Sequence, residues 1–310
     1  MNTSAVEKIA NAVLYEGYML YPYRPSALKN RQRFNFGVLY PRDYCELEAG
    51  SDAWEMRTEC LVVTENAESA MIEVSVRFLQ MAAREEWQDG LERVVTLPAA
   101  TLQSSAGQAL RHEFVLEPSR DAEGRCCERL VGEAELSTSQ LAGSVFKLTL
   151  NIRNRTEIET TRETTRDQAL MRSFVSVHSI LQATGGEFVS LLDPPEDLKG
   201  AVAECHSAGT FPVMAGIEGQ RGLMLSSPII LYDYPQVAPE SAGDLFDGTE
   251  IDEILALRIL TMTQEEKLEV RNGDDRARQI LERTEMMPPE HFQKLHGALR
   301  GMRVKPEGLL

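Results

Sequence analysis

Apolar and polar residues alternate along much of the first half of this 310-residue chain. The two clearest runs place apolar residues at every second position, at Ile72, Val74, Val76 and Phe78 and again at Phe146, Leu148, Leu150 and Ile152. Shorter runs of the same kind occur at 57–63, 92–97, 112–116 and 131–137. Because successive side chains of a strand point to opposite faces, this period of two predicts strands with one apolar and one polar face. We therefore expect an antiparallel β-sandwich or curved sheet between residues 55 and 153.

A helix is expected before these strands. Residues 4–20 have a broad apolar face, and Ser4 followed by Glu7 matches the capping-box pattern of a helix start. Prolines and a glycine then interrupt the chain, so residues 22–44 are expected to form an extended loop with short strands.

The second half changes character. A helix is predicted at 167–183, because Leu170, Phe174, Val177, His178 and Leu181 would share one of its faces. A second helix is expected at 196–206, and strands are expected at 187–192, 210–215, 222–226 and 228–234. Gly216, Gly219 and Gly222 indicate a turn between two of these strands.

The last 60 residues are expected to be helical, with capping boxes at Thr249 with Asp252 and at Thr263 with Glu266. The prediction is an α+β chain in two parts. Residues 1–165 hold an N-terminal helix, a Tyr/Arg-rich segment and a sandwich-like β-rich domain. Residues 166–310 form a mixed α/β region with a helical C-terminus.

Charge and composition exclude several classes of function. Apolar residues make up 43% and charged residues 26%, as in ordinary globular proteins, and the net charge is −16. Such a charge argues against nucleic-acid binding, because that binding needs a positive field. The sequence has no apolar stretch of about 20 residues and no secretory signal pattern, so we expect a cytoplasmic protein without a membrane span. Five cysteines, an odd number, do not suggest a disulfide framework.

Candidate chemical groups have structural interpretations that we prefer. His291 and His296 are five residues apart on one predicted helix and would not share a face. His178 is expected to be a core histidine with a satisfied hydrogen bond. The adjacent Cys126 and Cys127 are expected to place one thiol inward and one outward on a strand edge. Acidic residues such as Glu250, Asp252 and Glu253 suit the first turn of a helix.

A metal-binding protein or an enzyme is the alternative. It would use Cys205-His206, Cys126-Cys127 or the carboxylates Asp244, Asp247 and Glu250. The sequence contains no nucleophile elbow and no phosphate-binding glycine motif, so catalytic residues and cofactors remain unassigned and we do not expect an enzyme.

The tyrosines indicate recognition surfaces. Six of the eight fall within the first 44 residues, around a basic cluster, and the other two precede an acidic stretch without bases at 240–253. Tyrosine and arginine are enriched at the centres of protein interfaces. The predicted partner-binding residues are Tyr18, Tyr21, Tyr23, Arg24, Lys29, Arg31, Arg33, Tyr232, Tyr234, Asp244, Asp247 and Glu250. The basic arm could bind an external partner, the acidic stretch of its own chain, or that of a second copy in a homodimer.

Two segments carry a family resemblance. One runs from Ala12 to Arg24 and on through Ser26 to Arg31. The other runs from Ser227 to Pro235 and continues with Ala238 to Glu240 and Gly243 to Ile254. Together they resemble an uncharacterised bacterial protein family encoded beside the structural and maturation genes of [NiFe]-hydrogenases. The resemblance implies a context, the assembly, maturation or support of a hydrogenase. Together with the Tyr/Arg segment and the acidic stretch, it leads us to expect a non-enzymatic accessory protein that binds a hydrogenase subunit or a maturation factor. The resemblance covers the two ends of the chain well and the β-rich middle poorly.

Overall fold

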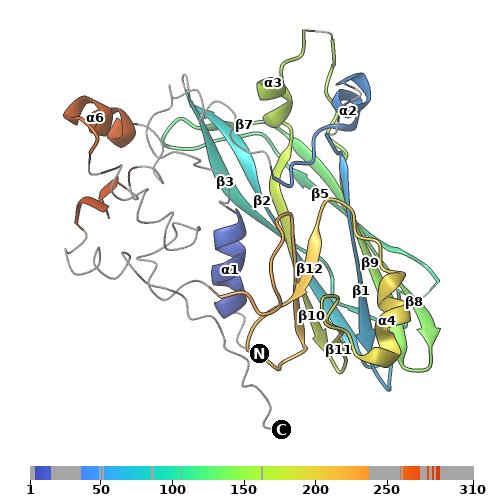
Figure 1. Cartoon of the computed structure of the whole chain (residues 1–310). Helices are drawn as coiled ribbons and strands as arrows, with labels where there is room; N and C mark the ends of the chain where they lie inside the picture. Colours follow the sequence, from blue (N-terminus) through green and yellow to red (C-terminus); the bar gives the residue numbers. More distant parts are fainter. Residues whose placement is uncertain are drawn as a thin grey trace. The chain divides into compact units, whose positions relative to one another are not determined.

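Two antiparallel sheets form most of the part of the chain that the computed structural model describes (Figure 1). The described residues are 4–14, 36–48, 50, 52–84, 87–105, 107–161, 163–236, 259, 261–272, 278, 281–282 and 284–286. By contacts between residues the chain divides into two units. One comprises Met1–Leu20 and Arg31–Gln236, and the other comprises Tyr21–Asn30 and Val237–Leu310.

The first unit contains both sheets. Over the described residues, a five-stranded sheet has the order β11-β1-β9-β8-β5, and an eight-stranded sheet has the order β12-β13-β10-β2-β7-β6 with β3 and β4 also paired to β2. The strands of the first sheet are β1 (Glu55–Val63), β5 (Leu110–Leu116), β8 (Leu130–Ala142), β9 (Val145–Asn154) and β11 (Glu187–Phe188). Those of the second are β2 (Met71–Arg84), β3 (Trp87–Thr96), β4 (Ala100–Thr101), β6 (Ser119–Arg120), β7 (Cys126–Cys127), β10 (Phe174–Thr184), β12 (Phe211–Met214) and β13 (Leu223–Ser227). All six runs of period two are strands, which confirms the predicted sandwich-like α+β class.

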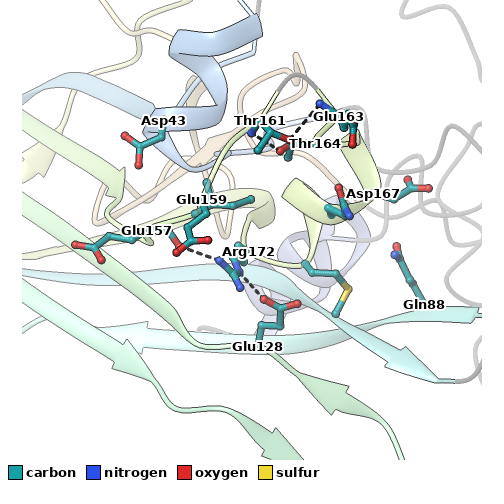
Figure 2. A pocket seen from close by; sticks show the side chains of 13 residues that line it. Asp43, Gln88, Glu128, Glu157, Glu159, Thr161, Glu163, Thr164, Asp167 and Arg172 are labelled. Carbon is teal, nitrogen blue, oxygen red and sulfur yellow. Dashed lines mark hydrogen bonds and ion pairs between the residues drawn. The ribbon is translucent and has the colours of Figure 1, made fainter.

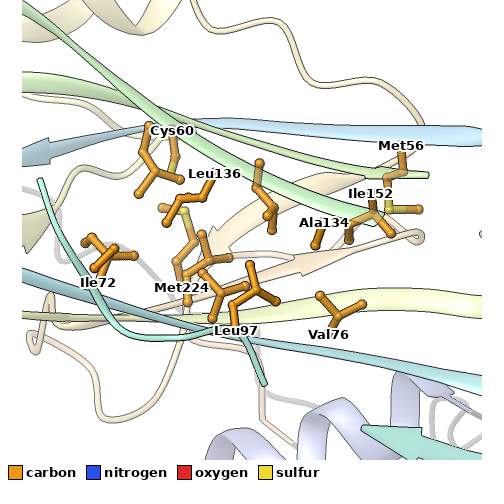
Figure 3. Packing of buried hydrophobic residues seen from close by; sticks show 14 of the residues in the cluster. Met56, Cys60, Ile72, Val76, Leu97, Ala134, Leu136, Ile152 and Met224 are labelled. Atoms are coloured by element: carbon orange, nitrogen blue, oxygen red, sulfur yellow. The ribbon is translucent and has the colours of Figure 1, made fainter. Parts of the chain in front are cut away.

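The main hydrophobic core combines side chains from both sheets (Figure 3). The alternation explains it: Ile72, Val74, Val76 and Phe78 of β2 all turn inward, as do the alternate apolar residues of β9. The rings of Phe78 and Phe174 lie 4.7 Å apart between centroids, and Phe114 packs 5.6 Å from Phe174. Apolar residues from the start of β1 to β13 therefore share one core.

Helices α1 (Ser4–Leu14) and α3 (Arg166–Leu170) both pack on the eight-stranded sheet (Figure 1). The apolar face of α1 packs on β12 and β13 in a separate cluster with Val213, Leu223 and Leu225. A third cluster joins Tyr40, Tyr44 and residues of α3 to Leu79 and Met81 of β2. The N-terminal helix predicted at 4–20 is confirmed for residues 4–14, and residues 15–20 lie outside the described part.

The helix predicted at 167–183 is wrong. Only α3 is helical there, and β10 begins at Phe174. The pairing of β10 with β2 shifts register between Val175 and His178, so a bulge adds one residue. The inward apolar residues Phe174, Val177 and Leu181 are consequently three and four positions apart, which is the spacing of a helix face.

Of the other elements predicted for the second half, some are confirmed and some are shorter than expected. The helix predicted at 196–206 appears as a 3-10 turn (Glu196–Leu198) followed by α4 (Lys199–Ala203), and β12 and β13 confirm the strands at 210–215 and 222–226. Gly216 and Gly219, with φ of 92° and 87°, lie in the turn between them. The predicted strand at 187–192 is only β11.

Two further predictions, a strand at 228–234 and a loop at 22–44, are also corrected. Residues 228–234 form no strand, because their backbone bends and Tyr234 has a φ of 53°. The loop predicted at 22–44 ends in a helix, α2 (Arg42–Glu48), and residues 22–35 lie outside the described part.

The eight-stranded sheet crosses the domain boundary expected at residue 165. Strand β10 lies after residue 165 and β2 lies before it, yet the two strands pair along most of the length of β10. Strands β12 and β13 extend the same sheet beyond β10.

The second unit contains α6 (Gln264–Asn272). Its predicted capping box is present: Glu266 N donates to Thr263 Oγ1 over 3.2 Å, and Thr263 N donates to Glu266 Oε2 over 2.9 Å. Lys267 and Arg271 both form ion pairs with Glu285. The capping box predicted at Thr249 and Asp252 lies outside the described residues.

Candidate functional site: an acidic groove

A wide cavity of about 1200 Å³ opens in the first unit beside α3 (Figure 2). We call it the acidic groove. It is lined by Asp43, Gln88, Glu128, Glu157, Ile158, Glu159, Thr161, Glu163, Thr164, Asp167, Gln168, Met171 and Arg172.

The groove is built from four parts of the chain. Asp43 comes from the first turn of α2, Gln88 from β3, and Glu128 from the link between β7 and β8. The remaining lining residues belong to α3 and the segments flanking it, between β9 and β10. Residues far apart in sequence therefore meet around one opening.

The segment before α3 is folded by its threonines. Thr161 N donates to Thr164 Oγ1 over 2.8 Å, and Thr164 N donates to Thr161 O over 3.0 Å, which closes a turn. Thr165 then caps α3 in a reciprocal pair with Gln168. These local hydrogen bonds fix the backbone that presents Glu163 and Asp167.

The charge of the lining is unbalanced. Among the described residues, the lining contains six carboxylates, from Asp43, Glu128, Glu157, Glu159, Glu163 and Asp167, and one guanidinium, that of Arg172. Arg172 Nε already donates to Glu128 Oε2, and its Nη1 donates to the Glu157 carbonyl over 3.2 Å (Figure 2).

Two nearby arginines are engaged elsewhere. Arg155 forms an ion pair with Glu133, and the guanidinium of Arg166 lies 5.7 Å from the centre of the Tyr40 ring. Ionised carboxylates only accept hydrogen bonds, so this lining favours a ligand rich in cationic donors.

Most residues of the predicted partner-binding set lie outside the described part of the chain. These are Tyr18, Tyr21, Tyr23, Arg24, Lys29, Arg31, Arg33, Asp244, Asp247 and Glu250. Tyr232 and Tyr234 are described, and neither lines the acidic groove.

Tyr232 and Tyr234 differ in their surroundings. Tyr232 is 86% exposed, whereas Tyr234 packs against the main core and donates its hydroxyl to the Gln220 carbonyl over 3.0 Å. Asp233 between them accepts from Met214 N over 2.8 Å and from Ser190 Oγ over 2.5 Å. This part of the resembling segment therefore anchors the chain to β12 and leaves one tyrosine facing solvent.

Two other tyrosines of the N-terminal group are core residues. The rings of Tyr40 and Tyr44 lie 5.2 Å apart and both residues are buried. Tyrosine clustering in this sequence therefore marks both core and surface positions.

The described cysteines do not have the surroundings of reactive thiols. Cys126 is exposed and Cys127 is buried on β7, both as free thiols, which confirms the prediction for this pair. Cys205 is half-buried, and burial, with the nearby Glu59 carboxylate, raises the pKa of its thiol to about 11. Such a thiol is a poor nucleophile at neutral pH.

His178 is a buried core residue, as predicted, although it lies on a strand and not on a helix. Its Nδ1 donates to the Ser176 carbonyl over 3.0 Å. His291 and His296 lie outside the described residues.

Within the described ranges, no three His, Cys, Asp or Glu side chains are arranged to hold a metal ion. No described helix is long and apolar enough to cross a membrane.

The acidic groove was not predicted from sequence. The stretch from Arg155 to Arg166 is rich in threonine, arginine and glutamate, but the same composition suits a strand end or a connector. Its three arginines match its three glutamates in number, so composition alone does not indicate an acidic surface here.

No family model matches the chain, and no curated protein matches its sequence.

Proposed function

We propose that this protein is a non-enzymatic accessory protein that binds a partner protein, and that the acidic groove receives a basic segment of that partner. The observation that carries the proposal is the charge of the groove: its described lining residues bring six carboxylates and one already paired guanidinium around a cavity of about 1200 Å³. Opposite charges across an interface speed association and select the partner.

The resemblance of the two end segments supports a particular context. We propose that the partner is a [NiFe]-hydrogenase subunit or maturation factor, and that binding supports assembly or maturation of the hydrogenase. The exposed Tyr232 would add an aromatic contact of the kind found at interface centres. The roles of the Tyr/Arg arm and of the acidic stretch at 240–253 stay predictions.

Co-purification from the native host tests the proposal. The test variant reverses three exposed groove charges, Glu157→Lys, Glu159→Lys and Glu163→Lys. A matched control makes the same change at exposed carboxylates outside the groove, Glu65→Lys, Glu68→Lys and Glu204→Lys. Both variants alter the net charge equally.

Mass spectrometry would compare the proteins recovered with each tagged chain. We expect the wild type and the control to retain a hydrogenase subunit or maturation factor and the groove variant to lose at least 90% of it. Equal recovery by both variants would remove the groove from the account. Recovery only of proteins unrelated to hydrogenase would remove the hydrogenase context.

A further inference from the structure

Helix α1 rests on the outer face of the eight-stranded sheet through two polar contacts and an apolar cluster. Arg77 Nη2 of β2 donates to Asn11 Oδ1 over 2.5 Å, and Ser176 Oγ of β10 donates to the Val13 carbonyl over 3.0 Å. The apolar residues of this seat are Ile180, Val213, Ala215, Leu223, Leu225, Ile229 and Leu231. The seat is separate from the core between the two sheets.

His178 lies in the middle of this seat. It follows Ser176 and precedes Ile180 on the same face of β10, and it stands opposite Arg77 in the strand register. Its side chain is fully buried. Nδ1 donates to the Ser176 carbonyl, which leaves Nε2 as a bare acceptor without a hydrogen-bond partner among the described residues.

This arrangement suits only the neutral imidazole. A proton on Nε2 would create a buried cationic donor without a partner among the residues that the structure describes, beside the guanidinium of Arg77. Glu92 of β3 lies 3.8 Å from Arg77, and the charged residues Glu7 and Lys8 of α1 are exposed. Burial lowers the pKa of His178 to about 4; the Ser176 hydrogen bond opposes this shift and the charge of Arg77 adds to it.

We propose that α1 is a proton-sensitive lid, which stays docked over a neutral His178 and is released when that imidazole is protonated. Release admits water to Nε2 and opens only the outer seat. It uncovers the apolar surface of Ile180, Val213, Leu223 and Leu225, while the core between the sheets stays closed.

The direction of the pH dependence follows from linkage. The pKa of His178 is about 4 with α1 docked, and in water an imidazole has a pKa near 6.5. Docking is therefore strongest above pH 6.5 and weakens about tenfold for each pH unit below it, until about pH 4. The total weakening is on the order of 300-fold.

Hydrogen exchange of the full-length chain between pH 7.5 and 4.5 tests this, with rates corrected for the intrinsic pH dependence of exchange. We expect residues 4–14 to lose protection about tenfold per pH unit below 6.5, while β9 at 145–154 keeps its protection. Retention of α1 protection at pH 4.5, or simultaneous loss in α1 and β9, would overturn the proposal.

Two variants separate the imidazole from general acid effects. His178→Asn keeps an amide N–H at the position of Nδ1 for the Ser176 carbonyl but does not titrate, so α1 should stay protected down to pH 4.5. Ile9→Ala weakens the apolar seat without touching His178, so release should occur at higher pH than in the wild type. Wild-type release profiles in both variants would contradict the proposed role of His178.

Discussion

Gly132 on β8 occupies a position where the core has no room for a methyl group. A Cβ built there would lie 2.1 Å from Cζ of the Phe114 ring, whose residue is buried between the sheets. We predict that Gly132→Ala lowers the free energy of unfolding by about 1–3 kcal/mol, because Phe114 must shift within a packed cluster.

Urea unfolding followed by circular dichroism would measure this change. Gly200→Ala in α4 is the control, since nothing lies within 4 Å of its added Cβ and alanine favours a helix. An unchanged midpoint for Gly132→Ala would show that the contact with Phe114 is not restrictive.

Glu133 and Glu135 on the outer face of β8 contribute to stability in their charged form. Burial raises the pKa of both carboxyls, but the arginines outweigh it and the net pKa is lowered. Arg153 and Arg155 donate hydrogen bonds to Glu133, and Arg111 and Arg153 donate to Glu135. Because the folded pKa is the lower one, this stabilisation is complete above about pH 4.5 and is lost as the pH falls through the folded value.

We predict that Glu133→Gln costs about 2 kcal/mol at pH 7 and makes stability less sensitive to acid below pH 4.5. Glu113→Gln serves as the control, because Glu113 is exposed and stands opposite Glu133 on β5. Thermal unfolding at pH 3, 5 and 7 would measure both effects. Parallel pH profiles for wild type and Glu133→Gln would contradict the role given to this carboxylate.

At the scale of elements, Asp233 fastens the segment 228–234 to β12 and to Ser190. We predict that Asp233→Ala costs about 1–3 kcal/mol, because Met214 N, on a buried residue, loses its acceptor. It should also raise hydrogen exchange at 228–236. Tyr232→Ala, at the exposed neighbour, should change stability by less than about 0.5 kcal/mol. Similar losses for the two variants would show that Asp233 is no anchor.

Sequence patterns predicted the strands well and the bulged strand badly. The runs at 72–78 and 146–152 are strands with the expected inward faces, because a period of two depends only on backbone geometry. Strand β10 does not show this period in its sequence, because the bulge at Ser176 inserts one extra residue. Its apolar side chains still point to the core on both sides of the bulge.

The acidic groove lies beyond the reach of such patterns. Glu128 precedes β8 and Glu157 follows β9, and the two come together because these strands pair antiparallel, with Gly132 opposite Asn154. The residues are far apart in sequence, so no local spacing indicates that they line one groove. The predicted site residues Tyr232 and Tyr234 were found by composition, but composition did not distinguish an exposed tyrosine from an anchored one.

At the scale of the whole molecule, the sandwich binds together residues on both sides of position 165. Phe174 of β10 packs on Phe78 of β2, and the two strands pair antiparallel. We predict that a fragment of residues 1–165 shows no cooperative unfolding, because it lacks β10, β12 and β13, whereas a fragment of residues 1–236 keeps it. Urea titration of both fragments would test this. Cooperative unfolding of the short fragment would instead support an independent domain ending at 165.

Partner binding through the acidic groove is the central claim, and site-specific photo-crosslinking in the native host tests it most directly. A photoreactive amino acid would replace Glu159 in the groove or, as the control, Glu68 outside it. We predict crosslinks from position 159 to a basic segment of a hydrogenase subunit or maturation factor. We predict none to that protein from position 68. Crosslinks to that protein from position 68 alone, or to no hydrogenase-related protein from either position, would contradict the claim.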